Sequence, residues 1–139
     1  MRAIFYFCLS VLLIASFSAC GKGGGNSPEP NPPSEAPLTV VTDPAVNAVQ
    51  PPAPAPYTVR VTVTSDMPAN GVKIDVSARK DDGSGAPAFF TTTLNTSSVA
   101  STITITGTPA NTQCQVDVKV TSRSTASNTW TGSYRFSSK

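Results

Sequence analysis

The 139-residue chain contains no histidine and few charged residues. Histidine is the commonest general base and metal ligand, so its absence argues against the most frequent designs of hydrolytic and metal sites. Charged residues make up 13% of the sequence and leave a formal net charge of +2. No stretch gathers basic residues in the way that phosphate binding requires, so we expect no nucleic-acid partner.

The sequence also lacks a local pattern for catalysis or metal binding. Asp81-Asp82-Gly83-Ser84-Gly85 is its one acidic cluster, without the alternate ligand positions and closing Glu of a calcium loop. The serines and threonines do not lie in a nucleophile-elbow context. We therefore predict that the protein is not an enzyme and carries no metal or cofactor, and that residues 80–87 form a solvated hairpin loop.

An apolar run of about 14 residues, from Ile4 to Phe17, follows Arg2 and ends at Ser18-Ala19-Cys20. The run is short of the roughly 20 residues that span a bilayer as a helix. This arrangement resembles the signal peptide of bacterial lipoproteins, with small residues before Cys20 and Phe17 at the position usually held by Leu. The resemblance implies a signal peptide at residues 1–19, cleavage between Ala19 and Cys20, and membrane attachment through acyl chains on Cys20.

Two other interpretations of the N-terminus stay open. One is an uncleaved anchor, which the short run disfavours. The other is an ordinary secretory signal, for which Phe17 is too bulky at −3 of Cys20, although cleavage after Ser18 would place Ser16 there. Gly21 stands where an Asp often marks inner-membrane retention, which favours the outer membrane. No acidic run follows Cys20, and this absence favours the periplasmic face of the membrane. Exposure at the cell surface stays open.

Residues 20–56 have a composition that no packed core uses. Ten of the thirteen prolines fall here, and Gly23-Gly24-Gly25 adds a flexible joint. We interpret the segment as the lipidated cysteine followed by a disordered, extended linker. One apolar patch, Leu38–Thr42, is a candidate for a stray edge strand.

From Tyr57 onward the sequence alternates apolar and polar residues with a period of two. Short strands separated by turns, six or seven in number, predict an all-β antiparallel sandwich over residues 57–139. Asn70-Gly71 is expected to form a turn with positive φ. The expected strands lie at residues 57–64, 72–78, 88–94, 99–105, 114–120 and 130–136.

The stretch Gly107–Val120, with Pro109 and Thr112 leading into Val116-Asp117-Val118, resembles the corner before the sixth strand of a fibronectin type III domain. The resemblance implies an immunoglobulin-like sandwich, a fold used mostly for binding and spacing. Cys114 stands where that family carries its corner tyrosine. With Cys8 removed and Cys20 lipidated, Cys114 has no disulfide partner, so we expect a buried structural thiol.

Aromatic residues are the remaining candidates for binding. Trp130, Tyr134 and Phe136 alternate with polar residues, which favours a stripe that faces the core. Phe89 and Phe90 are adjacent, so a regular strand would point one of them outward. Phe90 and Trp130 are the candidate contact residues. We predict a membrane-anchored cell-envelope lipoprotein whose β-sandwich is a non-catalytic interaction or structural module, with an unidentified envelope protein or glycan as partner. The alternative is a glycan-binding or adhesion module using exposed aromatics.

Overall fold

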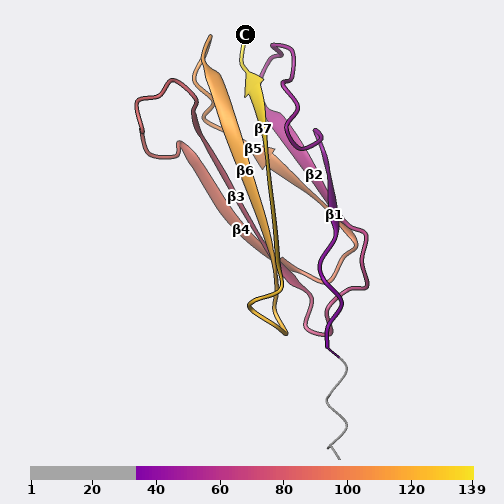
Figure 1. The fold of residues 1–139 in the computed structure, drawn as a ribbon. Helices are drawn as coiled ribbons and strands as arrows, with labels where there is room; N and C mark the ends of the chain where they lie inside the picture. The colour runs from indigo at the N-terminus through magenta and orange to yellow at the C-terminus, as the bar shows by residue number, and fades with distance from the viewer. Residues whose placement is uncertain (1–33) are drawn as a thin grey trace, which may run out of the picture. The chain divides into compact units, whose positions relative to one another are not determined.

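The computed structural model describes residues 34–139, which form an all-β sandwich of seven antiparallel strands without a helix (Figure 1). The predicted fold class is confirmed. The strands are β1 (Val40–Asp43), β2 (Tyr57–Val63), β3 (Val72–Lys80), β4 (Phe90–Thr96), β5 (Ala100–Ile105), β6 (Gln113–Ser122) and β7 (Thr129–Ser137).

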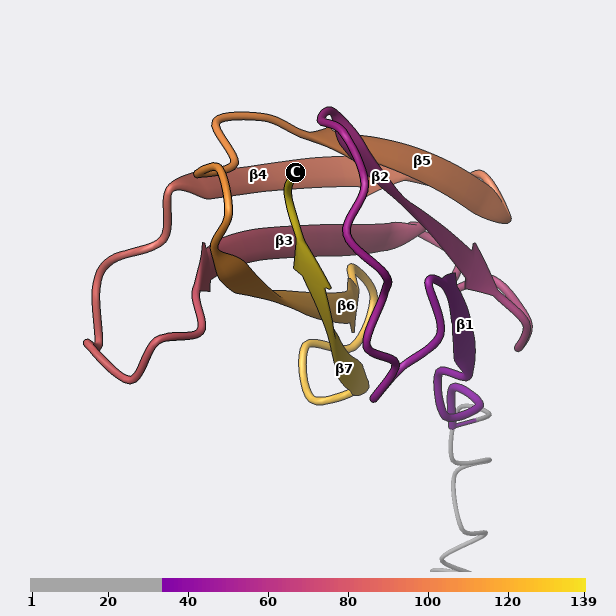
Figure 2. The ribbon, with the colours of Figure 1, turned by 90° about the horizontal axis from the view of Figure 1, so that it is seen from above.

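The strands divide between two sheets, of order β1-β2-β5 and β4-β3-β6-β7 (Figure 2). The chain changes sheet between β2 and β3, between β4 and β5, and between β5 and β6. Seen from above, β4 and β5 lie along one side of the sandwich, and β1 and β7 lie along the other. The register places Val76 between Thr92 on β4 and Val118 on β6, so these side chains share one face.

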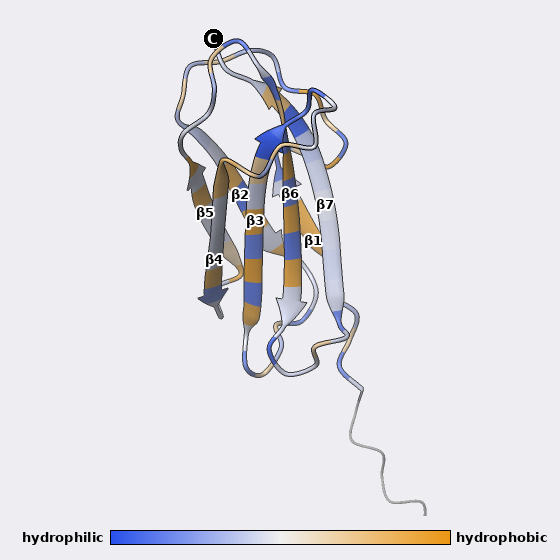
Figure 3. Cartoon of the chain, turned by 90° about the vertical axis from the view of Figure 1, so that its left-hand side faces the viewer, coloured by the Kyte–Doolittle hydropathy of each residue, from blue (hydrophilic) through white to orange (hydrophobic). Residues whose placement is uncertain are grey.

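The core lies between the sheets and is built from the alternating stripes of the sequence. Figure 3 shows β3 and β6 banded in apolar and polar residues, as expected when every second side chain is buried. β-Branched residues dominate because they pack well on a pleated surface. The most buried core side chains are Val59, Val61, Val72, Ile74, Val76, Ala78, Ile105, Cys114, Val116, Val120 and Phe136.

The folded domain begins well before residue 57, which corrects the predicted linker boundary. Leu38 and Val40 are buried in the core, and β1 pairs with β2 from Val40 opposite Val63. Residues 47–53 then run beside β7, where the Asn47 N–H donates to the Ser133 carbonyl (2.7 Å). Proline cannot donate to a ladder, but the residues between the prolines can, so a Pro-rich segment still covers this edge.

Two polar contacts fix the start and the end of this early segment. Asn128, in the turn between β6 and β7, donates to Glu35 Oε1 (2.6 Å) and accepts from the Leu38 N–H (2.9 Å). At the other end, the Tyr57 hydroxyl accepts from the Ala53 N–H (3.0 Å) and lies within bonding reach of the Ala53 and Ser137 carbonyls. The chain is therefore held to the sandwich from residue 35 onward.

The predicted turn between β2 and β3 is confirmed at Gly71. Its φ is +73°, and its N–H donates to the Pro68 carbonyl (2.7 Å). A Cβ at this position would overlap the Thr96 carbonyl oxygen, so both the backbone conformation and the space require glycine.

Candidate interaction surfaces

The predicted cleavage site at Ala19 and the lipidated Cys20 lie outside the described residues, 34–139. The lipid anchor therefore stays a prediction of the sequence.

Phe89 and Phe90 both pack against the core and are both half-buried, so the expected in-and-out alternation is wrong here. The reason is local. Phe90 lies opposite Ala78 of β3, and the Phe89 N–H also donates to the Ala78 carbonyl (2.9 Å). Two consecutive residues thus face one residue of β3, as in a β-bulge, which breaks the alternation that a regular strand would impose. β4 accordingly begins at Phe90, two residues later than predicted.

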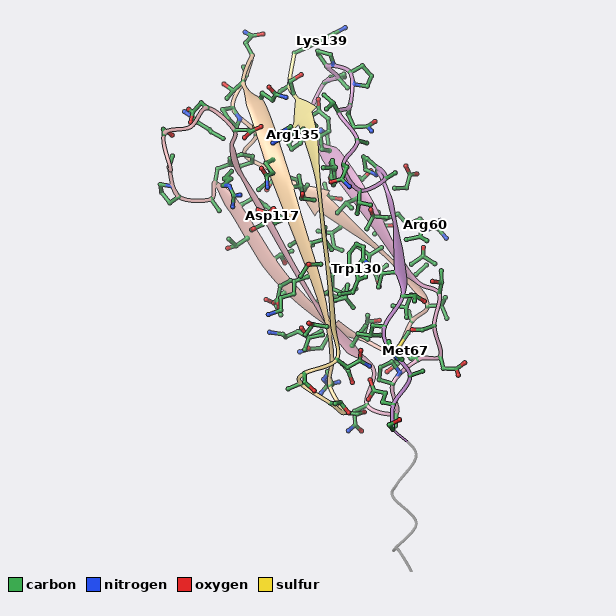
Figure 4. The ribbon with its side chains drawn as sticks, in the orientation of Figure 1. Arg60, Met67, Asp117, Trp130, Arg135 and Lys139 are labelled. Carbon is green, nitrogen blue, oxygen red and sulfur yellow. The ribbon has the colours of Figure 1, made fainter. Side chains whose placement is uncertain are left out.

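Trp130 lies on the face of β7 that looks into the sandwich, together with Tyr134 and Phe136, so the predicted core-facing stripe is confirmed (Figure 4). Trp130 itself is half-buried. Its ring folds over Gly132, where an added Cβ would overlap both the ring and the side chain of Val46. The missing side chain of Gly132 thus makes the space that Trp130 occupies.

Cys114 is fully buried and unpaired, as the sequence predicted. Its thiol lies 3.6 Å from the Thr112 carbonyl, a weak contact for a sulfur donor. Burial raises the pKa of the Cys114 thiol, so the reactive thiolate is disfavoured.

A groove of about 940 Å³ extends along the four-stranded sheet. It is lined by residues from all four strands and by the segment beside β7. The lining includes Val46, Asp75, Thr93, Asp117, Lys119 and Trp130.

The two carboxylates of the groove are engaged by neighbouring side chains. Asp75 pairs with Lys73 (2.9 Å) and accepts from Thr93 Oγ1 (2.6 Å). Burial opposes ionisation of Asp75, but the Thr93 hydrogen bond and the Lys73 charge together lower its pKa. Asp117 pairs with Arg79 of the adjacent strand β3 (2.8 Å). Both carboxylates therefore have partners within the sheet, and the lowered pKa of Asp75 keeps that group charged at neutral pH.

The two carboxylates of the loop after β3 are held by nearby groups. Asp82 Oδ1 accepts from the Ser84 N–H (2.9 Å), and Asp81 forms an ion pair with Arg135 of β7 (2.5 Å). Residues 82–85 are exposed, as a solvated loop should be. Within residues 34–139, no three acidic, cysteine or histidine side chains gather in a way that could hold a metal ion.

The outer edges of the two sheets differ in how they are covered. β1 has only four residues and is followed by Pro44, and residues 47–53 run beside β7. On the opposite side, β4 and β5 each pair with a single neighbour among the strands that the structure describes. Both strands lack charged residues and proline. The sequence alone does not reveal this feature. The uncharged stretch Phe90–Thr96 is visible in it, but only the order of strands in the sheet shows that the stretch forms an edge.

Comparison with known proteins returned no relative: no family model, curated protein or solved structure matches this chain. No helix long and apolar enough to traverse a bilayer is present in the part of the chain that the structure describes.

Proposed function

We propose that this protein is a cell-envelope lipoprotein, attached to the outer membrane through acyl chains on Cys20, whose β-sandwich serves as a non-catalytic interaction or structural module. The sequence around Cys20 motivates the anchor. The main support for an interaction or structural module is that the chain enters the sandwich at one fixed point, the contact between Glu35 and Asn128.

This entry point lies at one end of the sandwich, and the C-terminal Lys139 lies at the other (Figures 1 and 4). The loop after β3 and the connection between β5 and β6 also lie at the end of Lys139. These loops therefore lie at the end of the sandwich remote from the point where the chain enters it. That arrangement suits display of a binding surface on a rigid support.

The revised domain boundary shortens the proposed tether. Between Cys20 and Glu35 there are 14 residues, and at about 3.1 Å per residue in extended polyproline geometry they reach on the order of 40 Å. The linker predicted from composition, ending at residue 56, would have reached about 100 Å. The proposed module therefore works close to its membrane.

Mass spectrometry of the mature protein tests the anchor. We expect the first residue to be Cys20 carrying diacylglycerol, and we expect Cys20→Ser to leave the precursor uncleaved. A mature chain that begins at Ala19 would contradict the proposal. Protease treatment of intact cells, with lysed cells as the control, then distinguishes the periplasmic face from the surface.

The module is tested by affinity purification from detergent-solubilised envelope, followed by protein and glycan analysis. Reproducible recovery of one partner, lost after denaturation of the bait, supports an interaction module. Recovery of lipid alone argues against it.

The finer fold assignment is part of the proposal. A three-stranded sheet packed on a four-stranded one, with the chain changing sheet three times, supports a fibronectin-III-like or immunoglobulin-like sandwich. Cys114 occupies the start of β6, where the resemblance places the corner tyrosine, and it is buried there.

A second candidate function is glycan binding, and the position of Trp130 in the lining of the groove favours it. The half-buried Trp130 ring offers a surface on which a sugar can stack, while the charged lining residues Asp75, Asp117 and Lys119 lie on the other face of the sheet. Trp130→Ala should then abolish binding on a glycan array, whereas Phe90→Ala, which lies outside the groove lining, should retain it. Unchanged binding by Trp130→Ala, with folding verified by circular dichroism, would exclude this candidate.

A further inference from the structure

Strand β4 is an unprotected sheet edge. Its sequence, Phe-Thr-Thr-Thr-Leu-Asn-Thr, contains no charge, no proline and no glycine, and among residues 34–139 it pairs only with β3. Natural sheet edges are usually shortened, charged, interrupted by proline or covered, because a free row of N–H and C=O groups recruits another strand. Uncharged segments of this length with high β-propensity are those most prone to pair.

The opposite side of the same sandwich has the usual protection. β1 is four residues long and is followed by Pro44, and the segment 47–53 covers β7. The contrast within one domain indicates that protection is missing specifically from β4 and β5.

Of these two edge strands, β4 is the one whose inward side chains are only partly buried. The inward residues of β5, Ile103 and Ile105, are 7% and 0% exposed. Leu94 of β4 faces the same way as its neighbour Ile74, yet Leu94 is 37% exposed and Ile74 only 1%. No residue of β4 is fully buried. The side chains of β4 therefore extend beyond the cover that the opposite sheet provides.

We propose that β4 pairs antiparallel with β4 of a second copy of this chain, about a two-fold axis at Leu94. Leu94 then lies opposite Leu94 of the second copy, Thr93 opposite Asn95, and Thr92 opposite Thr96. Every pair in this register is uncharged, and threonine pairs suit the pleated surface. The two four-stranded sheets join into one of eight strands, and the exposed Leu94 side chains cover each other.

The register uses the open part of the strand. The start of β4 is occupied by its own fold, since Gly107 of the β5–β6 connection lies beside the Phe89 carbonyl. Centring the axis on Leu94 leaves Phe89 and Phe90 outside the pairing. An axis placed nearer to Phe90 would bring the second copy against this connection.

A second copy fits this edge better than a foreign peptide because the strand is complementary to itself. Its residues 92–96 carry no charge by which a particular foreign sequence would be selected. Five paired residues bury far less than the roughly 800 Å² per partner of a stable interface, so we expect dissociation in the micromolar range. Attachment of both copies to one membrane would raise their effective concentration and strengthen the pair. The pairing itself does not depend on the anchor.

Cysteine cross-linking of the full-length chain tests the register directly. Opposite residues of a non-hydrogen-bonded antiparallel pair have Cα atoms about 4.5 Å apart, which is within the range of a disulfide. Under mild oxidation in detergent, we expect Leu94→Cys to form at least about ten times more covalent dimer than the wild-type chain. Thr104→Cys, an exposed residue on the other free edge, is the matched control and should stay at the wild-type level.

The wild-type chain shows how much covalent dimer Cys8, Cys20 and Cys114 form without an added cysteine, whether or not Cys20 carries lipid. Equal cross-linking of Leu94→Cys and Thr104→Cys would overturn the proposal. A Leu94→Cys adduct with a different protein would overturn it in favour of a foreign partner. As an independent measurement, Leu94→Lys places like charges on the two-fold axis and should raise the dimer dissociation constant at least about tenfold in sedimentation equilibrium. A wild-type chain that is monomeric at about 1 mM contradicts the pairing.

Discussion

Removing the hydroxyl of Tyr57 should destabilise this domain, whereas removing the hydroxyl of Tyr134 should stabilise it. Tyr57 and Tyr134 both stack near Phe136, with ring centroids 4.0 Å and 6.3 Å from its ring. Their hydroxyls differ. That of Tyr57 bonds to the Ala53 backbone and lies by the Ser137 carbonyl, whereas that of Tyr134 is buried without a hydrogen-bond partner within residues 34–139.

The expected changes in the free energy of unfolding follow from the hydrogen bonds that each hydroxyl makes or lacks. Tyr57→Phe removes hydrogen bonds that are worth about 1 kcal/mol each in net terms, so we expect a loss of about 1–2 kcal/mol. Tyr134→Phe removes a buried hydroxyl whose unpaired burial costs about 1–3 kcal/mol, and we expect a gain of about 1 kcal/mol. For a domain of about 100 residues, 1 kcal/mol corresponds to about 4 °C or more in Tm.

Urea unfolding followed by tryptophan fluorescence measures both variants on the same scale, with Trp130 as the one tryptophan. The slope with urea should stay unchanged, because neither variant alters the surface exposed on unfolding. The opposite signs form the test. If Tyr134→Phe is destabilised as much as Tyr57→Phe, hydrogen bonding of the hydroxyls does not govern their contribution.

Four further outcomes are expected. Gly132→Ala should lower stability by about 1–2 kcal/mol, because overlap with the Trp130 ring outweighs the smaller backbone gain from alanine; unchanged unfolding would refute this. Asn128→Ala should lower the protection of the Leu38 amide against hydrogen exchange. In the wild type the protection factor of this amide should also fall as the pH drops through the pKa of Glu35, which the Ser122 hydrogen bond lowers, because the contact is lost as that carboxylate protonates. Cys114 should react with a thiol reagent at least about 100-fold faster after unfolding than before, and equal rates would contradict its burial. Stability should fall above about pH 10, because burial raises the pKa of Tyr134 and only the unfolded chain ionises there; Tyr134→Phe should reduce that fall.

The strands with strict alternation were predictable from sequence because their burial depends on the strand itself. Val116, Val118 and Val120 recur at every second position, and any sheet that buries one of them buries all three. The same argument placed β2, β3 and β7.

The early segment was not predictable because its partners are distant in sequence. Composition marks residues 44–56 as unable to build a core, and they do not build one. They lie along β7 through backbone hydrogen bonds, and a side-chain pattern carries no signal for those. The Glu35–Asn128 contact likewise joins residues 93 positions apart.

The candidate surfaces were predictable only in part. The polar faces of β3 and β6 followed from alternation, including the carboxylates Asp75 and Asp117. The bulge at Phe89 and Phe90 broke the alternation on which the contact prediction rested. The free edge at Leu94 depends on the order of strands in the sheet, which a single sequence does not encode locally.

The direction in which β1 leaves the entry point has a mechanical consequence. β1 runs away from Glu35 along the length of the sandwich and pairs antiparallel with β2. In the proposed anchored protein, a pull between the membrane and a partner bound at the far loops acts along β1. Its backbone hydrogen bonds lie across that pull and share the load together, whereas a hairpin opened from its end would lose them one at a time. A pull of this kind would thus load the pairing of β1 with β2 in shear, so that its hydrogen bonds break together and not in sequence.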